Sequence, residues 1–432
     1  MTEGVPRGGS VKNPKNVFWL GLTSLLTDVS SEMIFPILPI FLTGVLRAPM
    51  PIVGVIEGIA EATASIFKYV SGRVSDKVKR RKTLTVFGYS FSAVSKPFFA
   101  LSFFWWHVLV FRFLDRVGKG IRTSPRDALI KESVDEERIG RSFGLHRAMD
   151  TFGAIAGTII VSVALFTWGS SAEHLRNIFW LSFIPAALAV FCLVVFVKEP
   201  RRGGEESAFP PQMLDAAVKP SVQDAGFRGE ADGRPLVFSK NFKLLLVAAA
   251  IFALGNFSYA FFILRAQDAG TDLAFIPLVY LLYNASYAAA AYPIGRLSDR
   301  IGRTKVLIAG FVLFSLTNLG FAFGANAYTV WILFALYGIF VAAGDTIFRA
   351  LVADLAPLQQ SGKAFGAYHL VAGLAALPAN FFGGILWQDI GKPAPFIFAA
   401  ATSAVAIIPL ALLGNIERQK RIYGAEQFKG YR

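Results

Sequence analysis

The stretch Gly72-Arg73-Val74-Ser75-Asp76 returns 223 residues later as Gly295-Arg296-Leu297-Ser298-Asp299. Each copy ends a long apolar segment and is followed by basic residues. The same interval carries Arg126 onto Arg349. An interval shorter by one residue relates two further triplets: Gly140, Phe143 and Gly144, and Gly362, Phe365 and Gly366. Three matches within one residue of a common interval predict that the chain holds two parallel copies of one structural unit.

The composition is that of a membrane protein. The chain has 432 residues, 54% of them hydrophobic and 17% charged, and its mean hydropathy is +0.51. Soluble domains have about 25% charged residues, so this apolar excess is too large for one or two soluble cores. A helix needs about 20 apolar residues to cross the bilayer. Twelve such stretches are present: Val17–Thr43, Ile52–Val74, Thr83–Phe103, Trp105–Ile121, Phe143–Phe166, Ile178–Val197, Leu244–Leu264, Phe275–Leu297, Lys305–Phe323, Tyr328–Val352, Phe365–Trp387 and Pro395–Leu413.

We therefore predict an all-α membrane protein with twelve transmembrane helices in two pseudo-symmetric six-helix halves. The predicted parts are a cytoplasmic N-terminal tail (1–16), an N-terminal half (17–198), a cytoplasmic central linker (199–238), a C-terminal half (239–416) and a cytoplasmic C-terminal tail (417–432). The linker is polar and rich in glycine and proline, which is typical of a mobile segment. Two complete repeats in one chain favour a monomer.

Basic residues predict the orientation. The net charge is +14, and the Lys and Arg residues gather in alternate connections, such as Lys77–Lys82 and Arg300–Lys305. Because cytoplasmic loops are enriched in Lys and Arg, both termini are expected in the cytoplasm. The expected location is a plasma membrane, the inner membrane in a bacterium. The positive charge is then a topology signal, with some contact to the lipid bilayer, and not a nucleic-acid surface.

Several of these motifs resemble those of the major facilitator superfamily. Gly72–Lys82 is similar to the family's loop signature after helix 2, and Gly295–Arg303 is a closer copy after helix 8. Arg112–Gly120 resembles the helix-4 motif of proton-coupled members, and Asp150–Gly157 resembles the glycine-rich helix 5 of drug/proton antiporters. The resemblance covers essentially the whole chain. It implies a rocker-type transporter with its substrate held between the halves.

The resemblance also implies a cytoplasmic gate. In the family, the aspartate of the loop signature, the basic residue four positions later and an acidic residue beyond helix 4 form a charge network that holds one conformation. In this chain the corresponding residues are Asp76, Arg80 and Asp127, with Asp299 and Arg303 in the second half. Gly72 and Gly295 beside them are expected to let neighbouring helices approach closely.

Charged residues inside the predicted spans mark a candidate cavity. A charge at the bilayer centre costs at least ~2.5–3.5 kcal/mol, so it should be functional or paired. The N-terminal half carries most of them: Asp28 and Glu32 on helix 1, Glu57 and Glu61 on helix 2, Arg112 and Asp115 on helix 4, and Asp150 on helix 5. One interpretation is a polar cavity whose carboxylates bind and release protons. The other is a network of ion pairs that holds the helices together.

Helix 8 adds a polar and aromatic stripe. Tyr280, Tyr283, Asn284 and Tyr287 fall on one face at helical spacing. Such a surface suits a flat, amphipathic or cationic ligand through stacking and cation–π contact. Packing between helices explains the stripe equally well.

These features predict a secondary active transporter that works by alternating access, not an enzyme. The sequence lacks an ATP-binding glycine loop and a nucleophile elbow, its four histidines are scattered, and Cys192 is its only cysteine. No cofactor and no metal site are expected, and an ion gradient should drive transport. The acidic pairs and the tyrosines favour proton-coupled export of a small cationic or amphipathic molecule, as in multidrug efflux. The alternatives are transport of a divalent metal or an organic anion, uptake by symport and, in another class, an intramembrane enzyme.

Overall fold

A computed structural model of the chain describes residues 13–78, 80–135, 138–199, 239–355 and 361–429. Each of the twelve predicted stretches is helical over most of its length. The first half consists of α1 (Lys15–Ile34), α2 (Leu38–Ile40) and the π-helical turn η1 (Phe41–Val45), followed by α3 (Met50–Val78), α4 (Arg81–Ala100), α5 (Trp105–Glu132), α6 (Ile139–Trp168) and α7 (Ala172–Phe196). The second half consists of α9 (Lys240–Gly255), α10 (Tyr259–Asp268), α11 (Ile276–Ile301), α12 (Arg303–Phe323), α13 (Thr329–Leu355), α14 (Ser361–Ile385), the π-helical turn η4 (Leu386–Ile390) and α15 (Ala394–Lys429).

Nine spans of the described chain are long and apolar enough to cross a membrane. The three remaining helices of the predicted twelve are α4, α5 and α11. They are long enough, but α5 carries several charged side chains and α4 and α11 carry many polar ones. In α5 the side chains of Arg112, Asp115 and Arg116 are buried, so these charges face protein and not lipid.

One predicted domain boundary differs from the structure, and two predicted segments lie largely outside the described residues. Helix α15 continues to Lys429, well into the residues predicted as a C-terminal tail. That part of the chain is rich in Glu, Gln, Lys and Arg, which favour helix without any need for an apolar face. The predicted linker, apart from Glu199, and residues 1–12 of the predicted N-terminal tail lie outside the described residues.

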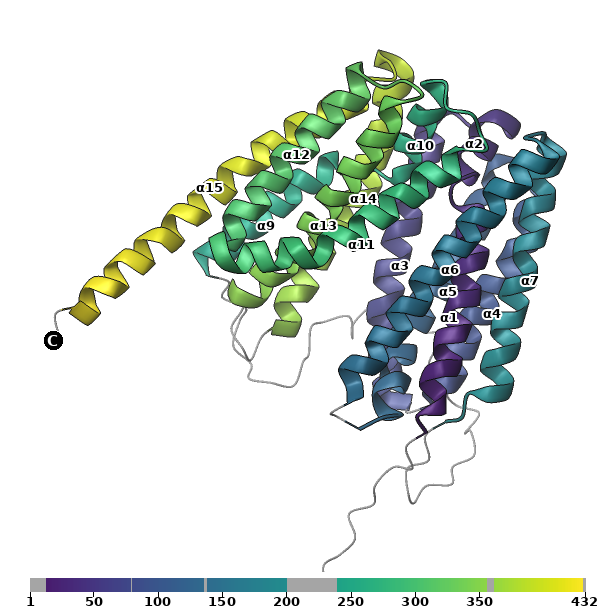
Figure 1. Ribbon diagram of the computed structural model, residues 1–432, viewed down its shortest axis with the longest axis horizontal. Helices are drawn as coiled ribbons and strands as arrows, with labels where there is room; N and C mark the ends of the chain where they lie inside the picture. The colour runs from purple at the N-terminus through teal and green to yellow at the C-terminus, as the bar shows by residue number, and fades with distance from the viewer. Residues whose placement is uncertain (1–12, 79, 136–137, 200–238, 356–360, 430–432) are drawn as a thin grey trace, which may run out of the picture.

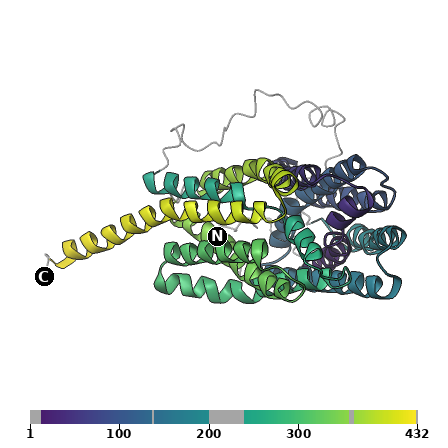
Figure 2. The same cartoon turned by 90° about the horizontal axis from the view of Figure 1, so that it is seen from above.

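The two halves form two bundles that meet at one end of the molecule and splay apart at the other (Figure 1). Viewed from above, the bundles lie side by side (Figure 2). We call the end where they meet the closed end; it includes α2 and α10. The opposite end, where α1 begins and α7 ends, is the open end. Helix α3 packs against α14, and α6 packs against α11, across the boundary between the halves.

Glycines allow α3 and α14 to approach closely at the closed end. A methyl group on Gly54 of α3 would lie 2.0 Å from the carbonyl oxygen of Asn380 on α14. A methyl group on Gly58 would lie 2.7 Å from Leu377 Cα, and one on Gly384 2.5 Å from the carbonyl oxygen of Met50. The backbones of α3 and α14 therefore touch, which only residues without a side chain allow.

Polar contacts fasten the open end of the N-terminal half. Asn16, fully buried at the start of α1, donates to Ser133 Oγ (3.1 Å) and to the carbonyl oxygen of Lys198 (2.8 Å). The Glu199 carboxylate accepts the backbone N–H groups of Arg81 and Lys82, both at 2.8 Å. A carboxylate at this position satisfies the free N–H groups at the start of α4.

Candidate functional site

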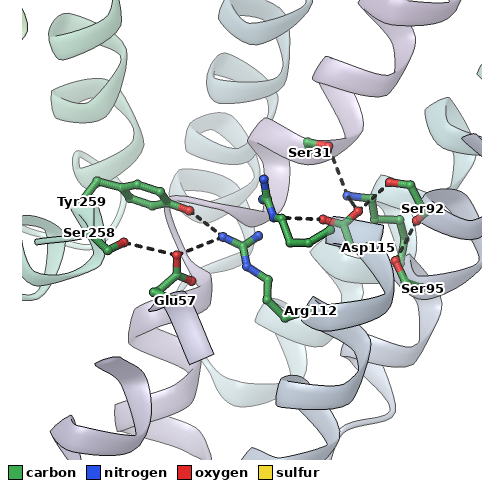
Figure 3. A network of polar contacts seen from close by, with 10 residues as sticks. Ser31, Glu57, Ser92, Ser95, Arg112, Asp115, Ser258 and Tyr259 are labelled. Atoms are coloured by element: carbon green, nitrogen blue, oxygen red, sulfur yellow. Dashed lines mark hydrogen bonds and ion pairs between the residues drawn. The ribbon is translucent and has the colours of Figure 1, made fainter. Parts of the chain in front are cut away.

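Four side chains join the two halves where α10 begins (Figure 3). Arg112 Nη2 on α5 lies 3.2 Å from Glu57 Oε2 on α3 and 3.0 Å from the hydroxyl of Tyr259. Ser258 Oγ donates to the same Glu57 oxygen at 3.2 Å. The side chains of Arg112 and Glu57 are each only 1% exposed. We call Glu57, Arg112, Ser258 and Tyr259 the interhalf network: an ion pair of the N-terminal half bonded by two residues of the C-terminal half.

A break in the seventh span positions the C-terminal part of this network. Helix α9 ends at Gly255 and α10 starts at Tyr259, so three residues between them are not helical. Ser258 N–H donates to Asn380 Oδ1 at 2.7 Å, and Ser258 Oγ accepts from Ala260 N–H at 3.3 Å. Side chains thus satisfy the backbone groups that the break frees, as irregular backbone at membrane depth requires.

A second buried ion-pair group surrounds Asp115. Lys96 Nζ on α4 lies 3.3 Å from Asp115 Oδ1, and Arg116 Nε lies 3.6 Å from Oδ2. Ser92 Oγ donates to Asp115 at 2.5 Å, and Lys96 donates to Ser31 Oγ of α1 at 3.2 Å. These bonds connect α1, α4 and α5. They are what we expect if the charges form a network of ion pairs that holds the helices together.

The aromatic ring of Phe35 lies close to three of these cations. It lies at the end of α1, 4.5 Å from Arg112 Cζ, 4.6 Å from Arg116 Cζ and 5.6 Å from Lys96 Nζ. The face of an aromatic ring attracts cations, most strongly where water is excluded. Phe35 therefore helps to hold several like charges close together in a buried place.

Three carboxylates of the N-terminal half are in a different situation. Among the described residues, Asp28 and Glu32 form no hydrogen bond or ion pair, and the buried Oε2 atom of Glu32 is left without a partner. Asp150 on α6 faces His146 Nδ1 at 3.5 Å through Oδ2, while its Oδ1 has no partner. These carboxylates are free to take up a proton without breaking a direct ion pair with Lys or Arg.

A cavity of about 420 Å³ lies between the halves. Its wall is rich in aromatic side chains from the C-terminal half: Phe252, Phe257, Tyr259, Tyr283, Tyr337, Phe340, Phe348 and Tyr368. Its polar lining includes Glu61, Asn256, Ser258, Asp345, His369 and Asn380. The carboxylate of Glu61 is exposed and has no bonded partner among the described residues. Asp345, in contrast, is bonded to Arg349 at 2.7 Å and to the hydroxyl of Tyr287 at 3.2 Å.

The structure divides the predicted helix-8 stripe. Tyr283 lines the cavity, and Tyr287 bonds Asp345 at its edge. Tyr280 is buried and packs on the rings of Tyr259 and Tyr283, and Asn284 donates to the carbonyl oxygen of Tyr280 at 3.1 Å. Packing thus explains Tyr280 and Asn284, and ligand contact is open mainly to Tyr283.

The structure describes the predicted gate residues of the second half more fully than those of the first half. In the second half Arg303 pairs with Asp299 at 3.8 Å and with Asp354, and it donates to the carbonyl oxygen of Ala350 at 2.7 Å. In the first half Asp127 pairs with Arg126 at 2.8 Å, and the side chain of Asp76 lies outside the described residues. Arg81 at the start of α4 forms an ion pair with Glu132 at the end of α5 (3.2 Å). Arg80 also has an interaction partner.

Neighbouring helices lie at ordinary contact distance from Gly72 and Gly295 in this conformation, so the expected close approach stays a prediction. A methyl group would lie 3.5 Å from Ser124 Oγ at Gly72 and 3.7 Å from Thr346 at Gly295, which are ordinary contacts. The packing requires glycine at the closed end, at Gly54, Gly58 and Gly384, and also inside the N-terminal half, at Gly153 and Gly157 between α6 and α1.

Sequence reasoning missed two parts of the site. Asn380 and Ser258 carry no charge and sit in apolar spans, so only the break in the seventh span reveals them. Lys96 and Ser92 around Asp115 were also absent from the predicted site. Among the described residues, no group of three His, Cys, Asp or Glu side chains lies where it could hold a metal ion.

Comparisons with known proteins agree on one family. The Major Facilitator Superfamily profile matches residues 20–264 and 244–428. An uncharacterised MFS-type transporter of Methanocaldococcus jannaschii is 38% identical over 92% of this chain and 94% of its own. A class H tetracycline resistance protein of Pasteurella multocida is 33% identical over 32% of this chain and 34% of its own.

Solved structures share the fold at low sequence identity. The nucleoside transporter NupG superposes with a TM-score of 0.70 at 14% identity, over 92% of this chain and 98% of its own. A peptide transporter POT in complex with sulfate gives 0.72 at 14% identity, over 95% of this chain and 97% of its own.

Proposed function

Because the chain belongs to the major facilitator superfamily, we propose that it exports a small cationic or amphipathic molecule in exchange for protons, by alternating access. The observation that carries this proposal is the cavity between the halves, where an unpaired carboxylate, Glu61, faces a wall of aromatic rings. Aromatic faces and a carboxylate are the groups that bind an organic cation. The partial similarity to a tetracycline resistance protein supports the direction of transport.

The division of charges supports coupling to protons. Glu57 and Asp115 are held in ion pairs with Arg112 and Lys96. Asp28, Glu32 and Asp150 form no ion pair with Lys or Arg in the described structure. An unpaired carboxylate in a medium of low dielectric constant is costly when ionised, so protons from one side of the membrane bind it readily and substrate can displace them.

The orientation we propose follows from the basic residues. Arg81 and Lys82 at the start of α4, and Arg300 and Arg303 at the end of α11 and the start of α12, all lie at the open end. The positive-inside rule then places the open end in the cytoplasm. The protein is proposed to act as a monomer in a plasma membrane, with both termini cytoplasmic and the cavity open to the cytoplasm in this conformation.

Liposomes that contain a pH-sensitive dye test this function. Lipophilic cations, divalent metal ions and organic anions are added to the reconstituted protein one class at a time. We expect proton movement with the lipophilic cations. A response to metal ions or organic anions alone would replace the proposed substrate class, and silence with all three, for folded protein, would contradict proton coupling.

Glu61 is expected to bind the charge of the substrate. Glu61→Gln should weaken binding of tetraphenylphosphonium roughly tenfold, since a bond to a charged group is lost, and should leave binding of an uncharged aromatic compound unchanged. Equilibrium dialysis of the purified protein measures both affinities. Tyr287→Phe, next to Asp345 at the cavity edge, is the control. Equal loss of both ligands would show that the variant damages the cavity and not its charge.

Asp76 is expected to act in switching and not in binding. Asp76→Asn should slow net transport strongly while the affinity for tetraphenylphosphonium at equilibrium stays within twofold of wild type, about the size of a small surface effect. Transport into liposomes and dialysis in detergent give the two numbers. A loss of affinity as large as the loss of transport would place Asp76 in the binding site.

A further inference from the structure

We infer that Ser258 and Tyr259 latch the closed end of the transporter by bonding the Glu57–Arg112 ion pair across the boundary between the halves. The inference rests on alternating access, and it is independent of the transported substrate and of proton coupling. Ser258 and Tyr259 are positioning residues in this scheme, because they act through the ion pair.

The first step is the location of the four side chains. Glu57 lies three residues after Gly54, whose backbone touches Asn380, and Asn380 in turn accepts the N–H group of Ser258 at 2.7 Å. The network is therefore within about one helical turn of the tightest contact between α3 and α14. Any separation of these helices pulls Ser258 and Tyr259 away from Glu57 and Arg112.

The second step is what such a separation would break. Glu57 and Arg112 both belong to the N-terminal half and stay together at 3.2 Å. Within the interhalf network, the bonds of Ser258 to Glu57 (3.2 Å) and of Tyr259 to Arg112 (3.0 Å) are the ones that cross the boundary. A neutral bond from Met50 N–H to Gln388 Oε1 (3.2 Å) also crosses it. No charge loses its counter-ion, so the large penalty for an unpaired buried charge does not arise. The contact is therefore strong enough to favour closure and weak enough to be reversed.

The third step connects the latch to the cavity. Ser258 and Tyr259 belong to the interhalf network and also line the cavity, as does Asn380, which accepts the Ser258 N–H group. The latch thus forms the wall that separates the cavity from the closed end. Opening of this wall is the event that would give a bound molecule access to the other side of the membrane.

Spin-label distances at the closed end test the latch. In a Cys192→Ser background, labels are placed by Phe104→Cys in the N-terminal half and Tyr328→Cys in the C-terminal half; both side chains are exposed. Their helices place both positions at the closed end. The double variant Ser258→Ala and Tyr259→Phe removes the two crossing bonds and retains the ion pair. We expect the ratio of long to short distances to rise about tenfold or more.

Tyr283→Phe is the matched control. Tyr283 lines the same cavity but forms no hydrogen bond within the described residues. The distances between the two spin labels in the Tyr283→Phe variant should therefore equal those of wild type. Thermal unfolding in detergent checks that all variants are folded. Ser258→Ala alone, with a smaller shift in the same direction, serves if the double variant is unstable. An unchanged distribution in folded Ser258→Ala and Tyr259→Phe variants would overturn the latch, whereas a failure of proton-linked transport in wild type would overturn only the proposed coupling.

Discussion

Proton-driven transport is expected to fall to the level of protein-free liposomes when Glu32 is replaced by glutamine. The Oε2 atom of Glu32 is buried without a bonded partner, and Asp28, Lys119 and Arg116 interact with this carboxylate electrostatically. Glutamine keeps the size and polarity of the side chain and removes its ability to exchange a proton. Since Asp28 lies one turn away on the same face of α1, Asp28→Asn is expected to give the same result.

The Glu57→Gln variant is the comparison that separates loss of proton coupling from loss of stability. Removal of one partner from the buried Glu57–Arg112 pair leaves Arg112 without a counter-ion, which costs about 3 kcal/mol or more in stability. Glu32→Gln instead removes an unpaired carboxylate, so the thermal unfolding temperature should stay the same or rise. Dye-loaded liposomes report coupling, and thermal unfolding in detergent reports stability. If Glu32→Gln and Asp28→Asn both transport normally against a proton gradient, neither is the coupling group.

Gly54→Ala is expected to hold the closed end open. Its methyl group would lie 2.0 Å from a backbone oxygen of α14, and no side-chain rotation relieves a contact with backbone. Overpacking of this kind costs about 1–3 kcal/mol, and it acts only on the conformation in which α3 and α14 touch. The equilibrium should therefore move about five- to 150-fold toward separation of the closed end, with a strong loss of transport.

Gly157→Ala provides the comparison. Its methyl group would meet the carbonyl oxygen of Val29 at 2.4 Å, also a backbone contact, but α1 and α6 belong to one half and stay together in both conformations. This variant should lower the unfolding temperature and leave the label distances between Phe104→Cys and Tyr328→Cys unchanged. A Gly54→Ala protein that keeps short distances and full transport would contradict a closed end that separates during the cycle.

The architecture could be predicted because its signals are local or repeated. Apolar stretches of about 20 residues need no knowledge of neighbours, and the repeat of Gly72–Asp76 at Gly295–Asp299 fixes the division into halves. Composition alone does not select α4, α5 and α11 as spans. Basic residues still mark where α4 begins, at Lys77–Lys82, and where α11 ends, at Arg300–Lys305. The end of α15 was missed because a polar helix outside the membrane carries no apolar signal.

The site could be predicted by composition but not by pairing. Glu57 and Glu61 lie one turn apart on the same face of one helix, so their spacing gives no reason to assign them different roles. In the structure Glu57 is buried against Arg112, 55 residues further along the chain, whereas Glu61 is exposed in the cavity. That difference arises from how α3 lies against α5 and against the other half, which one sequence does not encode in any local pattern.

The ion pair between α4 and α5 has a consequence for how the chain enters the membrane. Neither helix qualifies as a span by its own hydropathy, so each alone would partition poorly from the translocon into lipid. Lys96 and Asp115 lie 3.3 Å apart and Ser92 bonds the same carboxylate, so these two charges neutralise each other when the helices leave the translocon as a hairpin. Biogenesis of this half would then proceed by insertion of α4 and α5 as one unit, with the salt bridge already formed before α6 is synthesised.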